Sequence, residues 1–429
     1  MPLQDYRPMM ERCSNCLNCR WVPFDKLKSL RFGENCPSVC YYGFGTYSAR
    51  GRFQLGQSVL DGEVDESEAV GDIIHSCLAC GACDVSCKVC RYNLEPLAHN
   101  LALKEEAVSR GWVKPAHRAI MEGLRTEQTM LPGRRKADRT AWQEGLGLKD
   151  VFQEKAEVLF FPGCKYAYEE DLREKTRGMV RLMQKAGVDL GVLGSAEACC
   201  GGRAADMGYA DEARERVAAN CRACGKAGVT TVVTPCADCL HAFKRQYAEA
   251  GATFEVLHVT EYLERLVATG ALALPGRIPM TVTYHDPCKL GRQGEPYEAW
   301  NGVEKKIRNQ IHTWDPKRPR YNGAYGVYDA PRRLLEAIDG VRLVEMERIR
   351  EYSWCCGASG GCEAAEPEFS AWTASERVTE ARATGAAAIA TACPWCKGRL
   401  GTAVDENGDA MPVVDIVDLV LQAAGEVQA

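Results

Sequence analysis

The sequence predicts an α/β fold in which a small helical N-terminal region precedes two duplicated α/β domains with mostly parallel sheets. Three observations support this prediction. A pattern of five cysteines occurs twice in the last two-thirds of the chain, short β-rich runs end directly at those cysteines, and helix-like segments separate the runs. Repeated alternation of strand, loop and helix is typical of parallel sheets covered by helices.

Four apolar runs are the expected strands, and each leads directly into a cysteine. The runs are residues 158–161, 231–234, 282–284 and 387–390, followed by Cys164, Cys236, Cys288 and Cys393. The expected helices between them are residues 170–185, 205–226, 330–338 and 363–384. Because open parallel sheets bind ligands at the carboxyl ends of their strands, we expect the cysteines to gather at that edge.

The length of 429 residues exceeds what one hydrophobic core usually serves, so several domains are expected. The cysteine positions suggest four parts. They are an N-terminal domain at 1–110, a helical connector at 111–156 with a turn at Pro132-Gly133, a first repeat at 157–275 and a second repeat at 276–429.

The composition argues against several classes of protein. A net charge of −5 gives no reason to expect nucleic-acid binding. The N-terminus lacks a basic stretch followed by an apolar one, and no apolar run approaches the roughly 18 residues that span a bilayer. We therefore expect a cytoplasmic protein without a direct membrane span. In a reducing compartment, 23 cysteines indicate metal binding rather than disulfides.

Each repeat supplies five cysteines, including an adjacent pair that is followed by glycine. The first set is Cys164, Cys199, Cys200, Cys236 and Cys239, and the second is Cys288, Cys355, Cys356, Cys393 and Cys396. Four thiolates already complete a tetrahedral zinc site, so a fifth indicates a polynuclear iron-sulfur cluster. Zinc ribbons or buried free cysteines are the alternative, which the recurrence of the whole pattern disfavours.

Gly201 and Gly357 follow the two adjacent pairs and are candidate cofactor-binding residues. A glycine would let the backbone approach a cluster closely, and an ordinary turn is the alternative role. Helices are expected to begin after several of the cysteine loops, where their free amide groups favour the negative charge of a sulfide-rich cluster.

The first 110 residues contain ten further cysteines with spacing close to that of bacterial two-cluster ferredoxins. In those proteins, three cysteines of one run and a fourth from the other run bind each cubane [4Fe-4S] cluster. The expected sets are Cys13, Cys16, Cys19 and Cys87 for one cubane, and Cys77, Cys80, Cys83 and Cys36 for the other. The spacing departs from the usual pattern in both runs, so Cys90 remains an alternative to Cys87, and Cys40 to Cys36.

The second repeat contains an insertion at about 292–326. Cys288 and Cys355 are 67 positions apart, whereas Cys164 and Cys199 are 35 apart. The inserted segment holds seven Lys or Arg and four Asp or Glu. We expect it to overhang the second five-cysteine site, as a lid or as a docking surface for an anionic substrate or partner. A surface insertion without chemistry is the alternative.

An isolated cysteine, then Cys-Cys-Gly, then CxxC is the CCG motif. Together with residues 284–288 (YHDPC) and 327–332 (VYDAPR), it resembles the catalytic subunit of heterodisulfide reductase. Two cubane sets ahead of two CCG copies are similar to the D-type form of that enzyme, in which the ferredoxin-like and CCG subunits are fused. The resemblance implies a helical ferredoxin-like two-cluster domain followed by two duplicated α/β CCG domains.

The same resemblance implies two cubane and two noncubane [4Fe-4S] clusters, with each five-cysteine set holding one noncubane cluster. Electrons would pass from the cubane to the noncubane clusters for disulfide reduction within an anaerobic complex of several redox subunits. An A-type flavoprotein of the heterodisulfide reductase family, with electron bifurcation as one option, would be the donor, and a membrane cytochrome is the alternative. The sequence carries no nucleotide-binding fingerprint of its own.

Homologous subunits also occur in complexes such as class II benzoyl-CoA reductase, so an electron relay toward an acyl-CoA reductase is the alternative function. Cleavage of a disulfide releases two thiolates and requires protons. His285 and Lys289 flank Cys288 and are the candidate catalytic residues, with a structural role as the alternative for each. The remaining cysteines receive no role, including the CxxC of Cys221 and Cys224 and the single Cys362.

Overall fold

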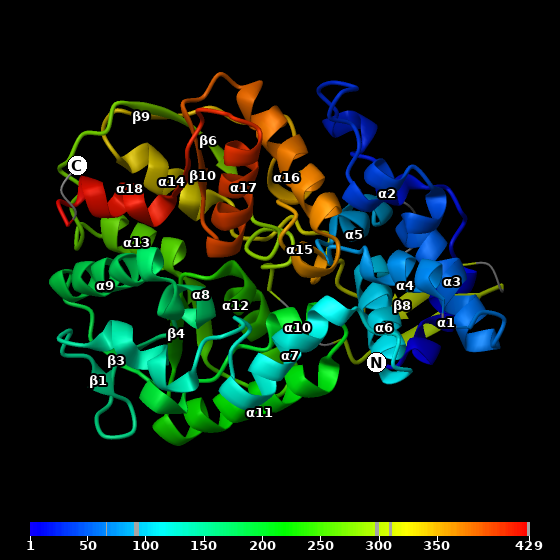
Figure 1. The fold of residues 1–429 in the computed structure, drawn as a ribbon, viewed down its shortest axis with the longest axis horizontal. Helices are drawn as coiled ribbons and strands as arrows, with labels where there is room; N and C mark the ends of the chain where they lie inside the picture. Colours follow the sequence, from blue (N-terminus) through cyan, green and yellow to red (C-terminus); the bar gives the residue numbers. More distant parts are fainter. Residues whose placement is uncertain (66, 90–93, 297–299, 309–310, 427–429) are drawn as a thin grey trace.

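The computed structural model describes residues 1–65, 67–89, 94–296, 300–308 and 311–426. The protein forms three lobes (Figure 1): a helical N-terminal lobe in blue and cyan, a first repeat mainly in green, and a second repeat from yellow to red. Each repeat contains a parallel sheet, so the predicted α/β class with mostly parallel sheets is confirmed.

The N-terminal lobe is built from short helices. They are α1 (Arg7–Glu11), α2 (Pro37–Tyr42), α3 (Ala49–Asp61), α4 (Glu68–His75), α5 (Ala82–Cys87) and α6 (Pro96–Ser109). The side chains of Ser48 and Ser67 accept a backbone N–H in the first turn of α3 and of α4, which fixes where these helices begin. Phe53, Ile74 and Leu103 belong to an apolar core of the lobe's own.

The connector is helical only in part. Helix α7 (Pro115–Glu127) is followed by the 3-10 helix η5 (Lys136–Gln143) and then by strand β1 (Lys149–Asp150). Strand β1 pairs in parallel with β3 (Leu190–Val192) of the first repeat. The prediction of a helical connector is therefore wrong at its C-terminal end. Gly145 and Gly147 adopt left-handed φ values of 72° and 62°, which interrupt the helical turns before the strand.

The two repeats supply the remaining regular elements. The first contains β2 (Val158–Phe160), β3, β4 (Thr231–Thr234) and β5 (Glu255–His258), with α8 (Gly163–Tyr168), α9 (Glu170–Lys185), α10 (Gly202–Asp206), α11 (Ala210–Ala227), α12 (Ala237–Ala242) and α13 (Val259–Ala268). The second contains β6 (Met280–His285), β9 (Val341–Leu343), β10 (Ala388–Thr391) and β11 (Val413–Asp415), with α14 (Asp329–Ala337), α15 (Cys362–Ala365), α16 (Pro367–Arg382), α17 (Pro394–Glu406) and α18 (Ile416–Ala423). Among the described residues, no helix has the length and apolarity needed to cross a membrane.

The two sheets share one connectivity. Their strand orders are β1-β3-β2-β4-β5 and β11-β10-β6-β9, with β2 and β6 in equivalent central places. The chain direction across the sheet reverses between β2 and β4 and between β6 and β10, and open parallel sheets bind ligands at the carboxyl ends of strands at such points. The loops that leave these four strands carry Cys164, Cys236, Cys288 and Cys393, so the cysteines gather at the predicted edge.

Two expected helices are each broken into two. The expected helix at 205–226 is interrupted at Met207–Tyr209, where Gly208 has a left-handed φ of 95°. The expected helix at 363–384 is interrupted at Glu366, because Pro367 takes the first helical position of α16 and disfavours a helical conformation at the residue before it. Both breaks lie just after a Cys-Cys-Gly loop, so a short helix follows each loop before the long one begins.

The repeats pack on each other through reciprocal helix contacts. Helix α13, the last of the first repeat, contacts α14, the first long helix of the second repeat, and α18 contacts α9 in the same manner. Figure 1 shows these four helices side by side between the two sheets. Tyr166 in α8 also donates a hydrogen bond to Asp415 at the start of α18. The duplication is therefore visible in the packing as well as in the sequence.

The insertion in the second repeat forms an antiparallel hairpin of β7 (Val303–Ile307) and β8 (Ile311–Asp315). Figure 1 shows β8 in the same region of the view as the N-terminal lobe. Ion pairs and hydrogen bonds attach the insertion there: Arg12 with Glu304 at 2.7 Å, Arg318 with Glu95 at 3.7 Å, and Lys88 Nζ with Tyr321 O at 2.5 Å. The hairpin thus lies against the N-terminal lobe, while Arg292 at the start of the insertion lies near the second five-cysteine site, and the expected overhang stays a prediction.

A buried lysine joins all three lobes. Lys104 in α6 is fully buried, and its Nζ donates to Cys77 O of the N-terminal lobe at 2.7 Å, to Asp206 O of the first repeat at 3.1 Å and to Gly360 O of the second repeat at 2.9 Å. Three donors and three carbonyl acceptors satisfy the ammonium group completely. The lobes consequently meet in one fixed arrangement around this side chain.

Candidate metal centres

Cys13, Cys16, Cys19 and Cys87 line one cavity of the N-terminal lobe. The first three come from the loop after α1, and Cys87 ends α5, so the structure brings the two cysteine runs together. Of the four, Cys16 is exposed. Cys90, the alternative to Cys87, lies outside the described residues. The assignment of Cys87 stays a prediction, and the geometry is compatible with it.

Cys36, Cys77, Cys80 and Cys83 line a second cavity of the same lobe. Asn100 Nδ2 lies 3.7 Å from the Cys77 Sγ and acts as a donor to it. Cys40, the alternative to Cys36, is not among the residues that line this cavity. Burial, together with a hydrogen bond to Glu34, raises the pKa of the Cys40 thiol. The geometry therefore favours Cys36 over Cys40.

The five cysteines of the first repeat form one continuous group. Cys164 lies in the first turn of α8, Cys199 and Cys200 precede α10, and Cys236 and Cys239 lie at the start of α12. All five are buried. Their thiols are linked by side-chain hydrogen bonds in the order Cys164, Cys199, Cys200, Cys239 and Cys236.

The second repeat reproduces this order with its own cysteines. The hydrogen-bonded series runs through Cys288, Cys355, Cys356, Cys396 and Cys393. Burial raises the pKa of Cys393 to about 11, and Asp238 and Cys236 of the first repeat add to the rise. The two sites therefore face each other across the contact between the repeats.

The second thiol of each adjacent pair is the acidic one. Hydrogen bonds from Cys199 and Cys239 lower the pKa of Cys200 to about 6. Hydrogen bonds from Cys355 and Cys396 likewise lower the pKa of Cys356 well below its usual range. A thiolate is the form that binds metals, so each site contains one cysteine already disposed to be a ligand.

Gly201 and Gly357 each lie where a neighbouring helix packs closely against the backbone. Both have left-handed φ values, 84° and 92°. A Cβ at Gly201 would lie 3.0 Å from the Ala213 carbonyl oxygen, and one at Gly357 would lie 2.4 Å from the Ser370 carbonyl oxygen. The role of these glycines in cofactor binding stays a prediction. Their amides still contact sulfur, because each N–H donates to the thiol two positions earlier, at 3.5 and 3.4 Å.

Arg139 supplies a buried positive charge to the first site. Its Nη2 donates to Cys164 Sγ at 3.4 Å, and its Nη1 forms an ion pair of 2.8 Å with Glu197. Both charged side chains are 2% exposed. Burial raises the pKa of Glu197 to about 7, although Arg139 opposes the rise. No local sequence signal identified Arg139, because it lies in the cysteine-free connector.

Arg292 is the corresponding cation near the second site. Its Nε donates to Cys80 O at 2.6 Å, and its Nη1 donates to the carbonyl oxygens of Glu351 and Ser353. The Nη2 atom is buried without a hydrogen-bond partner among the described residues. Its charge acts on the Cys80, Cys288 and Cys355 thiols. An anionic group held by those thiols would give this nitrogen a partner.

The second N-terminal cavity adjoins the second repeat directly. The thiols of Cys80 and Cys355 are hydrogen-bonded, which lowers the pKa of Cys80 to about 6. Cys80, Cys288 and Cys355 also belong to one buried apolar group with Phe369. One of the two five-cysteine sites thus touches the N-terminal lobe through a pair of candidate ligands.

The structure places His285 and Lys289 inside the protein. Lys289 Nζ forms a buried ion pair of 2.7 Å with Asp206 and donates to Gln293 Oε1 at 3.0 Å. His285 is 1% exposed, burial lowers its pKa, and its Nδ1 accepts a hydrogen bond from Arg377. Both lie beside the second site, and their catalytic role stays a prediction.

Cys221, Cys224 and Cys362 lie outside the predicted ligand sets. Burial raises the pKa of Cys221 and raises that of Cys224 to about 12, which is unlike the acidic thiol of a redox-active CxxC pair. Cys362 is fully buried and donates to His75 O at 3.3 Å. Every cysteine that the structure describes is free of disulfide bonding.

These donor sets fit iron-sulfur clusters. Two cavities are each lined by four thiols, and each repeat supplies five, which exceeds the need of a single zinc ion. A Cβ at Gly163 would lie 2.7 Å from the Cys239 Sγ, so only glycine leaves this sulfur free to face into the site. The Arg292 guanidinium places a buried positive charge beside the Cys80, Cys288 and Cys355 thiols, as an anionic cluster would need.

Comparisons with known proteins agree with this chemistry. The model of the CCG family, described as "Cysteine-rich domain", matches residues 158–244 and 318–401. The D subunit of dihydromethanophenazine:CoB–CoM heterodisulfide reductase from Methanosarcina mazei is 32% identical over 368 residues, which cover 84% of this chain and 80% of that protein. The chain belongs to the family of heterodisulfide reductase D subunits.

Other relatives place this family among iron-sulfur oxidoreductases. The corresponding heterodisulfide reductase protein of Methanosarcina barkeri is 29% identical, with 97% of this chain and 94% of that protein covered. The probable iron-sulfur-binding oxidoreductase FadF of Bacillus subtilis is 28% identical, with 94% of this chain but 53% of that protein covered. The chain is accordingly an iron-sulfur redox subunit of the oxidoreductase type.

Proposed function

We propose that this chain holds two cubane and two noncubane [4Fe-4S] clusters and carries electrons from its N-terminal lobe to a disulfide-type substrate between its repeats. The single observation that carries this proposal is the contact between Cys80 and Cys355, which joins an N-terminal cavity to a five-cysteine site. Iron-sulfur clusters supply one-electron transfer when bound. The proposed parts are residues 1–110 for the two-cluster domain, 111–156 for the connector, and 157–275 and 276–429 for the CCG domains.

Electrons would enter at the first N-terminal cavity, where Cys16 is the exposed cysteine. Phe44 and Val89 in the same lobe expose 69% and 61% of their surface, and exposed apolar side chains of this size often mark protein contacts. The proposed donor is an A-type flavoprotein of the heterodisulfide reductase family, in a complex with other redox subunits. The relatives named above support this proposal, since they include subunits of oxidoreductase complexes.

The proposed substrate space is the cavity between the repeats. It is lined by Arg203 and Asp238 of the first repeat and by Cys288, Lys289 and Cys356 of the second, among others. The Arg203 guanidinium lies 3.7 Å from the centre of the Trp395 ring, and Lys165 Nζ lies 4.6 Å from it. Arg203 is paired with Asp238 at 3.3 Å and Lys165 with Glu169 at 2.8 Å, so an anionic disulfide bound here would compete with these carboxylates for the two cations.

A pure electron relay to another reductase, such as an acyl-CoA-reducing protein, is the second candidate. The burial of all ten cysteines in the two repeats favours it, because each of them is at most 8% exposed. The match to FadF supports it as well, since that protein's name carries no heterodisulfide activity.

Anaerobic assay of the full, cluster-loaded chain with a reduced viologen dye and a small anionic disulfide distinguishes the two functions. The first predicts disulfide reduction, with a KM that rises in Arg203→Gln but not in the exposed control Arg214→Gln. Reduction of the clusters without turnover of any disulfide would support the relay. Loaded protein with no reducible iron centre would reject both.

A further inference from the structure

The two five-cysteine sites differ at one equivalent position. Phe161 and His285 each lie three residues before the first cysteine of their set, at the carboxyl ends of β2 and β6. Phe161 packs edge-on against Phe243, with 4.9 Å between ring centres, and has no polar atom to offer. The second site therefore contains a ring nitrogen that the first site lacks.

His285 lies beside the thiols of its site. One of its ring nitrogens and the sulfurs of Cys356 and Cys396 all lie within 4.8 Å of one another, and all three residues are buried. Two roles fit such a trio. The imidazole could bind a metal together with the two thiolates, or it could donate an N–H hydrogen bond to sulfur.

Arg377 decides between these roles. Its Nε donates to His285 Nδ1 at 3.0 Å. A guanidinium has no acceptor and is not deprotonated in proteins, so Nδ1 has to present its lone pair. The proton of the neutral ring is then on Nε2. A histidine that binds metal through Nε2 keeps its proton on Nδ1 and donates it to a carboxylate or carbonyl, which is the reverse of the arrangement here.

Because Nδ1 is bonded to Arg377, Nε2 is the ring nitrogen left for the neighbouring sulfurs. It is buried and has no hydrogen-bond partner in the described part of the chain. A side-chain interaction joins His285 to Cys356, one of the two neighbouring thiols. An N–H group in this place has only a thiolate or a cluster sulfur to meet.

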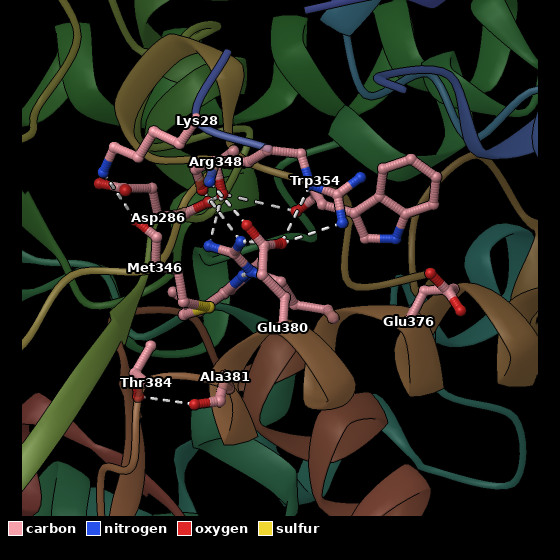
Figure 2. A network of polar contacts seen from close by, with 12 residues as sticks. Lys28, Asp286, Met346, Arg348, Trp354, Glu376, Glu380, Ala381 and Thr384 are labelled. Atoms are coloured by element: carbon pink, nitrogen blue, oxygen red, sulfur yellow. Dashed lines mark hydrogen bonds and ion pairs between the residues drawn. The ribbon is translucent and has the colours of Figure 1, made fainter. Parts of the chain in front are cut away.

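Arg377 itself is held by a buried network. Its Nη1 donates to Glu380 Oε2 at 2.8 Å and to Arg348 O at 2.9 Å, and its Nη2 donates to Ser353 Oγ at 3.1 Å. Figure 2 shows Arg348 and Glu380 facing each other in this network, with the ring of Trp354 alongside. Arg348 Nη1 also donates to Glu34 O of the N-terminal lobe at 2.8 Å. The Arg377 guanidinium is therefore held in place by hydrogen bonds to Glu380, Arg348 and Ser353.

We propose that His285 is a neutral N–H donor to sulfur at the second site and not a metal ligand, and that Arg377 is the positioning residue that sets this tautomer. The inference rests on the proposed function. Hydrogen bonds to sulfur stabilise the more negative, reduced state and raise the reduction potential. The second centre is consequently easier to reduce than it would be with the phenylalanine of the first.

Redox titration of the cluster-loaded full chain, followed by electron paramagnetic resonance, tests the proposal. His285→Phe, which copies the first repeat, and Arg377→Gln should each lower the potential of one noncubane centre by about 59 mV, the equivalent of a tenfold change in a one-electron equilibrium. The iron content should stay unchanged, and the other centres provide internal controls. Unshifted potentials, or loss of iron in His285→Phe, would overturn the proposal.

A second measurement needs no variant. Electron–nuclear double resonance on wild-type protein with ¹⁵N-labelled histidine should give a weak coupling between the cluster's electron spin and the ring nitrogen if the ring is hydrogen-bonded. A strong coupling would identify the histidine as a ligand and reject the inference. Wild-type protein without any noncubane signal would instead reject the proposed function, so the two failures are distinguishable.

Discussion

Neighbouring thiols lower the pKa of Cys200 and of Cys356, the second cysteine of each adjacent pair. We predict that Cys200→Ala or Cys356→Ala removes one noncubane centre and leaves the cubane centres in place. Iron analysis with electron paramagnetic resonance measures both effects. Cys221→Ala is the matched control, because this half-exposed thiol lies outside both sets. Unchanged spectra in either site variant would contradict the ligand assignment.

Arg139 and Glu197 form a buried ion pair whose partners depend on each other. We predict that Arg139→Gln lowers the free energy of unfolding by about 3 kcal/mol, because it leaves a buried carboxylate without its cation. The double variant Arg139→Gln/Glu197→Gln should recover part of this loss, since it removes both charges. Denaturant unfolding of the loaded protein measures the difference. Equal losses in the single and double variants would show that the pairing is not the cause.

At the scale of elements, the strands were predictable because each combines an apolar run with an abrupt end at a cysteine. Strand β4 was predicted at its observed bounds, as was helix α9. The break at Gly208 was not predictable, since a Cβ there would lie 2.5 Å from the Lys104 carbonyl oxygen, a contact between distant parts of the chain. Strand β1 was missed for a similar reason, because two residues form a strand only when a neighbouring strand is present.

His258 links strand β5 to helix α13. Its Nδ1 accepts the Thr260 N–H in a capping box, while its Nε2 contacts Pro235 O at 3.0 Å, so the ring is neutral. Burial lowers its pKa to about 3. Between this value and the ordinary value of about 6.5, the unfolded chain binds more protons than the folded one, so stability falls as the pH falls below about 6.5.

We predict that His258→Asn, which keeps a capping oxygen, makes this acid destabilisation shallower. The slope of unfolding free energy against pH between pH 6 and 5 should decrease by about 1.4 kcal/mol per pH unit, the effect of one proton. Denaturant unfolding of wild type and variant at several pH values measures the slopes. Parallel slopes would show that His258 does not titrate on unfolding in this range.

At the scale of the molecule, Lys104 connects the three lobes through three carbonyl groups. We predict that Lys104→Met destabilises the protein by about 3 kcal/mol or more, because each buried carbonyl loses its donor. Lys155→Met, at an exposed position, should stay within about 0.5 kcal/mol of wild type. Thermal unfolding of the loaded full chain compares them. A thermal unfolding midpoint for Lys104→Met equal to that of the control would contradict the role of Lys104 in holding the three lobes together.

The candidate sites were only partly predictable from sequence. The cysteines could be found because their spacing repeats along the chain. The cations beside them could not, since Arg139 reaches Cys164 from the connector and Arg377 reaches His285 from 92 positions away. The placement of the insertion against the N-terminal lobe was unpredictable as well, because it depends on contacts such as the ion pair of Arg12 with Glu304.

The contacts of Lys104 with the three lobes also concern the burial of the repeat cysteines. The ten cysteines of the repeats lie below the surface once the lobes have met, and a lysine shared by all three lobes ties that closure together. Because one ammonium group contacts all three lobes, separation of any one lobe breaks at least one of its three hydrogen bonds.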